Sequence, residues 1–113
     1  MPWIAVATLE QLRKTQSVKF RFRREGIKRD GFAALFAGQV IVYENICRHL
    51  PITIDYADNR FFTGDGKEII CQTHGAIYEP LTGLCTRGPC EGASLFKVPF
   101  EMREGVVHVE SEE

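Results

Sequence analysis

Residues 47–75 read CRHLPITIDYADNRFFTGDGKEIICQTHG, and this stretch decides the interpretation of the whole chain. It opens with Cys47 and His49 one residue apart and closes with Cys71 and His74 two residues apart. Between the two pairs lie the 21 residues from Leu50 to Ile70. A thiolate and an imidazole so close together on a tight loop can be aimed at one metal centre, and two such loops supply four converging ligands. The stretch therefore predicts a metal site of two cysteines and two histidines.

Short strands and turn residues surround the two motifs. Val18, Phe20 and Phe22 alternate with Lys and Arg, which predicts a strand with one apolar and one cationic face. Further strands are expected at residues 33–37, 39–45, 61–63, 68–70, 76–79, 96–100 and 106–109, with turns at 65–66 and 104–105. This succession of short strands and turn residues indicates an all-β sandwich or barrel.

One short helix is expected before the first predicted strand. Thr8 can accept a hydrogen bond from an otherwise unpaired N–H, and Gln11 stands at the capping-box position. The helix should occupy residues 9–14 and end by about Gln16.

Size and composition limit the functions to be considered. A chain of 113 residues, 26% charged and 44% hydrophobic, predicts a single globular domain over residues 1–113. The formal net charge of −1 favours neither nucleic acid nor a membrane as partner. The first residues lack the basic and long apolar segments of a signal peptide, so we expect a cytoplasmic protein whose cysteines bind metal or stay reduced.

The two motifs resemble the signature of the Rieske family, Cys-x-His followed downstream by Cys-x-x-His-Gly. The resemblance covers residues 45–95 and implies one [2Fe–2S] cluster per chain. It implies a Rieske-type antiparallel β-sandwich or barrel, with an inserted cluster-binding subdomain of two ligand loops at about residues 45–95. In that family the cysteines bind the inner iron and the histidines the outer one. Carried over, Cys47 and Cys71 bind the first iron, and His49 and His74 the second.

The resemblance extends to residues around these ligands. Gly75 follows the second histidine, and Gly88 and Pro89 resemble the loop that packs over the cluster and keeps water from it. Tyr78 stands where respiratory members place a tyrosine whose hydroxyl bonds a ligand sulfur. Ala76 replaces their hydrogen-bonding serine, so we expect a potential below the upper end of the family range of about −150 to +300 mV.

A structural zinc site is the alternative, because two cysteines and two histidines are also a zinc ligand set. Gly75 and the Gly88-Pro89 pair, found together with the two-loop pattern, favour the iron–sulfur cluster. Cys85 and Cys90 flank the covering loop. They are expected to be packed free thiols, with a disulfide as the alternative.

Two surface hypotheses concern the partner. Acidic, basic and aromatic residues in the long spacer are candidates for a docking rim, with an ordinary hairpin as the alternative: Asp55, Asp58, Arg60, Phe61, Phe62 and Asp65. The cations between Lys19 and Arg29 are interpreted as the solvated face of an edge strand. An acidic redox partner is the other interpretation.

A lone cluster of this type moves one electron at a time. The resemblance therefore implies a soluble, ferredoxin-like electron carrier, not itself an enzyme, that delivers electrons to an oxygenase or another redox enzyme. Such a carrier needs an upstream reductase and a downstream redox enzyme. Two other functions stay open: a reductase subunit resembling the nitrite reductase small subunit, and a redox-sensing module.

Overall fold

The computed structural model describes residues 2–48, 50–55, 59–73 and 75–112. The chain divides into two compact units, one made of Met1–Glu44 and Lys97–Glu113 and the other of Asn45–Phe96. The described residues form nine strands and one helix, and every strand pair is antiparallel. The predicted all-β class is confirmed. The second unit spans nearly the same residues as the segment expected to bind the cluster, about 45–95, and that role stays a prediction.

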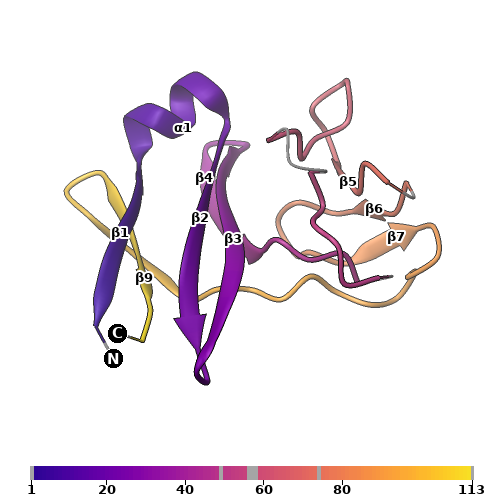
Figure 1. Cartoon of the computed structure of the whole chain (residues 1–113). Helices are drawn as coiled ribbons and strands as arrows, with labels where there is room; N and C mark the ends of the chain where they lie inside the picture. The colour runs from indigo at the N-terminus through magenta and orange to yellow at the C-terminus, as the bar shows by residue number, and fades with distance from the viewer. Residues whose placement is uncertain (1, 49, 56–58, 74, 113) are drawn as a thin grey trace. The chain divides into compact units, whose positions relative to one another are not determined.

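The first unit contains two three-stranded sheets (Figure 1). One has the order β1-β9-β8, with β1 at Trp3–Thr8, β8 at Phe100–Arg103 and β9 at Val106–Glu110. The other has the order β2-β3-β4, with β2 at Ser17–Arg24, β3 at Ile27–Phe36 and β4 at Gln39–Glu44. Sequence analysis did not predict β1, whose ladder partner among the described strands is the distant β9.

The strand predicted at residues 96–100 is wrong, because β8 begins only at Phe100. Pro99 has no N–H to donate to a ladder, and it separates β8 from the preceding residues. Those residues make single contacts with β4: Lys97 forms an isolated bridge with Tyr43, and Val98 N–H donates to Val42 O at 3.1 Å.

Helix α1, Leu9–Thr15, confirms the predicted capping box. Gln11 N–H donates to Thr8 Oγ1 at 3.1 Å, and the Gln11 side-chain oxygen accepts from Thr8 N–H at 2.8 Å. Leu12 is buried against the sheets, so the helix closes one end of the apolar core. Figure 1 shows α1 as the connection from β1 to β2.

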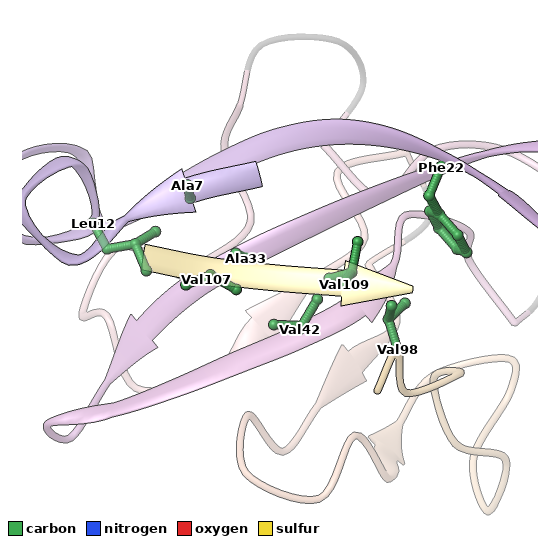
Figure 2. Close-up of a cluster of buried hydrophobic side chains, with 8 residues drawn as sticks. All are labelled: Ala7, Leu12, Phe22, Ala33, Val42, Val98, Val107 and Val109. Carbon is green, nitrogen blue, oxygen red and sulfur yellow. The ribbon is translucent and has the colours of Figure 1, made fainter. Parts of the chain in front are cut away.

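The apolar core of the first unit lies between its two sheets. Strands β2, β3 and β4 contribute Phe22, Ala33 and Val42, and β9 contributes Val107 and Val109. Figure 2 shows these side chains gathered along β9. The alternation predicted for β2 is confirmed, because Phe22 is buried while Lys19 and Arg21 are exposed. In its sheet β2 is an edge strand, as the basic face predicted.

The hairpin from β2 to β3 is held by a distant carboxylate. Glu25 and Gly26 form its turn with φ of 55° and 74°. Their N–H groups donate to the two Glu112 side-chain oxygens at 2.6 and 2.8 Å. These hydrogen bonds, from Gly26 and then Glu25, hold the pKa of Glu112 below its ordinary 4.5.

In the second unit β5 (Ile69–Ile70), β6 (Ile77–Tyr78) and β7 (Cys85–Arg87) form a sheet in the order β5-β6-β7. The turn predicted at Asp65 and Gly66 is confirmed: Gly66 N–H donates to Thr63 O at 2.8 Å. No helix in the described part of the chain is long and apolar enough to cross a membrane.

We expect Glu112→Gln to lower the midpoint temperature of unfolding at neutral pH, because it replaces a carboxylate acceptor by a neutral amide. The folded-state pKa is depressed, so this stabilisation is complete above pH 4.5 and is lost as the pH falls through the folded-state pKa. Thermal unfolding followed by circular dichroism at several pH values tests this. Glu110→Gln on the same chain segment is the control and should leave the midpoint close to wild type. A difference between wild type and Glu112→Gln that persists at pH 2 would contradict the assignment.

Candidate metal centre

The first predicted ligand loop is closed by its own backbone. Cys47 N–H donates to Ile52 O at 2.8 Å, and Ile52 N–H donates to Leu50 O at 2.7 Å. The Cys47 side chain is only 3% exposed. A thiol is therefore held inside the second unit by a tight turn that starts three residues after β4. His49, predicted as a ligand in this loop, lies outside the described residues.

Asn45 fixes the base of this loop. Its Oδ1 accepts from Ile54 N–H at 2.8 Å, and its Nδ2 donates to Asp55 Oδ1 at 3.1 Å. The second carboxylate oxygen of Asp55 accepts from Asn59 N–H at 2.8 Å. Asp55 is wholly buried, so its carboxylate stabilises the loop and does not face solvent.

The docking-rim hypothesis is therefore wrong for two of its members. Asp55 and Phe61 are 0% and 1% exposed, so neither can face a partner. Arg60 and Asp65 are exposed, and Asp58 lies outside the described residues. The region 61–70 forms a hairpin, in which Ile70 N–H donates to Phe61 O at 2.9 Å and Phe62 bridges to Ile69.

The second predicted ligand loop joins β5 to β6. Cys71 N–H donates to Ala76 O at 2.9 Å, and Gly75 N–H donates to Cys71 O at 2.8 Å. Gly75 has φ of 75°, a conformation that glycine adopts without strain. Cys71 is 0% exposed. His74, the fourth predicted ligand, lies outside the described residues.

The two loops lie against each other. Gln72 N–H, directly after Cys71, donates to Ile54 O of the first loop at 2.9 Å. Tyr78 lies on β6, the strand that follows the second loop. Its hydroxyl reaches the first loop and accepts from Arg48 N–H at 3.0 Å. The structure thus brings the segments of both predicted cysteine ligands together. The described residues gather no group of three or more metal-binding side chains.

Tyr78 is a fully buried residue with three polar partners. Besides Arg48 N–H, its hydroxyl lies 3.4 Å from Cys47 Sγ and 3.1 Å from Cys90 Sγ. Burial, followed by the hydrogen bonds with the two cysteines, raises the pKa of Tyr78 well above its ordinary 10.0. The hydroxyl therefore keeps its hydrogen for one of the two sulfurs.

Cys85 and Cys90 are free thiols, as expected from the sequence. Cys90 Sγ donates to Cys85 Sγ at 3.0 Å, and Cys85 Sγ donates to Arg87 O at 3.2 Å. Burial and the neighbouring Cys90 raise the pKa of Cys85 to about 11. Sequence reasoning missed the contact of Cys90 with Tyr78. The pattern around Gly88 and Pro89 predicts a turn but does not predict which side chains of that turn are buried.

Arg48 is a second residue that sequence reasoning missed. Its guanidinium donates to Ser94 O at 2.6 Å and stacks 4.4 Å from the centre of the Phe96 ring. Arg48 stands between two predicted ligands. Its side chain therefore ties the first ligand loop to the end of the second unit.

Gly88 and Pro89, predicted to cover the site, are exposed residues of the turn after β7. Gly88 has φ of 101° and approaches the backbone of Ala76 closely. A Cβ placed on Gly88 would lie 2.9 Å from Ala76 Cα. The turn therefore packs directly on the residue that follows Gly75, at the end of the second ligand loop.

We expect Gly88→Ala to destabilise the protein by about 1–3 kcal/mol, because positive φ and a backbone collision act together. Gly92→Ala is a matched control: Gly92 has φ of 91° in the same turn region, but a Cβ there meets no atom within 4 Å. Unfolding in urea should therefore rank the variants wild type, Gly92→Ala, Gly88→Ala. Equal losses in both variants would show that the approach to Ala76 contributes nothing.

Comparison with solved structures supports the fold. The ferredoxin of carbazole 1,9a-dioxygenase from Nocardioides aromaticivorans IC177 is 21% identical, with a TM-score of 0.72 and coverage of 99% of this chain and 100% of that one. The Sphingomonas yanoikuyae B1 ferredoxin is 19% identical, with a TM-score of 0.72 and coverage of 98% and 100%. A chain in a complex of reduced oxygenase and oxidized ferredoxin in carbazole 1,9a-dioxygenase is 24% identical, with a TM-score of 0.71 and coverage of 98% and 94%.

No curated protein sequence matches the chain. Among protein-family models, the one described as the Rieske [2Fe-2S] domain matches residues 2–106. That match spans both compact units, both ligand motifs and nearly the whole length of the sequence. The chain therefore belongs to the Rieske [2Fe–2S] domain family.

Proposed function

We propose that this chain is a soluble one-electron carrier of the ferredoxin type, a single Rieske domain over residues 1–113 with its cluster-binding part at about residues 45–95. It holds one [2Fe–2S] cluster through Cys47 and Cys71 on one iron and His49 and His74 on the other. The observation that carries this proposal is the pair of buried cysteines, Cys47 and Cys71, on two loops that are joined by the Gln72–Ile54 hydrogen bond.

The donor set fits this cofactor. Cys47 and Cys71 are buried, and each stands in a turn closed by backbone hydrogen bonds, so little ordering is needed when they bind. Thiolates are the usual ligands of iron–sulfur clusters, and imidazoles replace two of them in Rieske centres. When bound, the cluster accepts and returns one electron.

The remaining residues of the site adjust the charge on a ligand sulfur, shape the second loop and shield the cluster from water. Tyr78 places a hydroxyl beside Cys47 Sγ, where it can stabilise negative charge on the sulfur. Gly75 makes the tight return of the second loop possible. Gly88, in the turn that it forms with Pro89, packs on the backbone of Ala76, and we propose that this turn limits the access of water to the cluster.

The partners we propose are a reductase upstream and an oxygenase or another redox enzyme downstream. Support comes from the similar solved structures, two of which are named ferredoxins and one of which is a complex of an oxygenase with a ferredoxin. The chain covers 100% of the first two, so it matches whole carriers. We propose a cytoplasmic electron-transfer component that is not itself an enzyme and binds neither nucleic acid nor a membrane.

The ligand assignment is tested by substitution and spectroscopy of the purified protein. Cys47→Ser, Cys71→Ser, His49→Ala and His74→Ala should each lose the iron and inorganic sulfide. Cys85→Ser and His108→Ala are controls of the same residue types outside the ligand motifs and should keep both. Electron paramagnetic resonance of the reduced wild type should show the low average g value of mixed nitrogen and sulfur ligation. Stoichiometric zinc without inorganic sulfide in the purified wild type would contradict the assignment of these residues as cluster ligands.

The carrier role is tested separately. The purified wild type should be reduced and reoxidised reversibly by one electron and should pass that electron rapidly to cytochrome c without a bound partner. Stable co-purification with one large enzyme, together with slow transfer to cytochrome c, would contradict a free carrier and would favour a reductase subunit.

A further inference from the structure

A row of four buried polar side chains runs from the proposed ligand Cys47 away into the second unit. Cys47 Sγ lies 3.4 Å from Tyr78 Oη, which lies 3.1 Å from Cys90 Sγ, which lies 3.0 Å from Cys85 Sγ. The row ends where Cys85 Sγ donates to Arg87 O at 3.2 Å. All four side chains are less than a tenth exposed, so bulk water does not interrupt the row.

The number of hydrogens limits how this row can be arranged. A hydroxyl and a thiol each carry one hydrogen. With Cys47 as a thiol, four hydrogens serve four contacts, and they can all point away from Cys47 toward Arg87 O. This direction agrees with Cys90 donating to Cys85 and Cys85 donating to Arg87 O in the structure.

A cysteine that binds metal is a thiolate and has no hydrogen to give. The contact between Cys47 and Tyr78 then needs the hydrogen of the Tyr78 hydroxyl, and a hydrogen bond to an ionised acceptor is about twice as strong as a neutral one. Once that hydrogen points to Cys47, only the Cys90 thiol can supply one for the 3.1 Å contact between Cys90 and Tyr78.

We propose that Cys90 is a positioning residue for the cluster: its thiol donates to the Tyr78 hydroxyl and thereby strengthens the hydrogen bond from Tyr78 to the Cys47 sulfur. Because the one hydrogen of Cys90 then points to Tyr78, the contact between Cys90 and Cys85 reverses: Cys85 donates to Cys90 and no longer to Arg87 O. This inference rests on the proposed function, because it requires Cys47 to be a ligand. A donor on the ligand sulfur stabilises the more negative, reduced cluster, and hydrogen bonds in a chain reinforce one another. The thiol pair therefore raises the midpoint potential through Tyr78.

A double-mutant cycle on the cluster-loaded protein tests the coupling. Midpoint potentials are measured for wild type, Cys90→Ala, Tyr78→Phe and the double variant, each with iron and sulfide content confirmed. Cys90→Ala should lower the midpoint when Tyr78 is present and leave it unchanged when Tyr78→Phe is present. Cys90→Ser keeps a one-hydrogen donor and should retain most of the wild-type midpoint.

A second readout does not depend on potential. Resonance Raman bands of the iron–sulfur stretches should shift when the wild-type protein is transferred to D₂O, because the hydrogen on the ligand sulfur is exchangeable. That shift should be smaller in Cys90→Ala. If Cys90→Ala does not assemble the cluster, Cys85→Ala provides the same cycle one contact further out, with the same expected sign.

Two outcomes overturn the inference. An equal lowering by Cys90→Ala in both backgrounds would mean that Cys90 acts through packing or water access and not through Tyr78. An unchanged midpoint in both backgrounds would mean that Cys90 does not act on the cluster. Either result leaves the carrier function intact if the wild type shows a reversible [2Fe–2S] couple, whereas a wild type without that couple overturns the proposed function itself.

Discussion

One backbone hydrogen bond, from Gln72 N–H to Ile54 O, joins two loops whose cysteines are 24 positions apart in the sequence, at 47 and 71. Any site that needs both cysteines depends on this contact, because each loop alone offers a single sulfur among the described residues. The same residue is held on its other side, because the Ile54 N–H donates to the Asn45 side chain. The Nδ2 of the same Asn45 side chain donates to Oδ1 of the buried Asp55 carboxylate. This polar network thus fixes the base of the first loop, on which the contact with the second loop is made.

The two compact units are stabilised differently. The first has strands of four to ten residues and an apolar core between two sheets. The second has strands of only two or three residues, too short to hold a sheet by ladder bonds alone. Side chains replace the missing ladder: Asn45 and Asp55 in the first loop, and Tyr78 between the loops. Binding free energy of a cofactor adds directly to the stability of such a region.

The sequence predicted the features that depend on local chemistry. Thr8 and Gln11 marked the helix start, the alternation around Phe22 marked β2, and Asp65-Gly66 marked a turn, and the structure has all three. The segments of Cys47 and Cys71 also come together as the motifs indicated, whereas the ligand roles of Cys47, His49, Cys71 and His74 all stay predictions. The proximity of Tyr78 to a cysteine sulfur was expected from family resemblance and is present at 3.4 Å.

What the sequence did not predict depends on distant partners. Strand β1 forms by pairing with β9. It has a bulge between Ala5 and Ala7, which the local sequence pattern does not predict. The burial of Asp55 follows from Asn45 and Asn59, which compensate its charge with hydrogen-bond donors. Polarity alone made it resemble a surface residue.

The close approach of Gly88 to Ala76 links two positions that lie in different turns. The atom that a side chain at position 88 would meet first is the Cα of Ala76, which belongs to the backbone. No choice of residue at position 76 can therefore make room for it. Position 88 should stay glycine as sequences of this kind diverge, whereas the identity of residue 76 is free to vary without it.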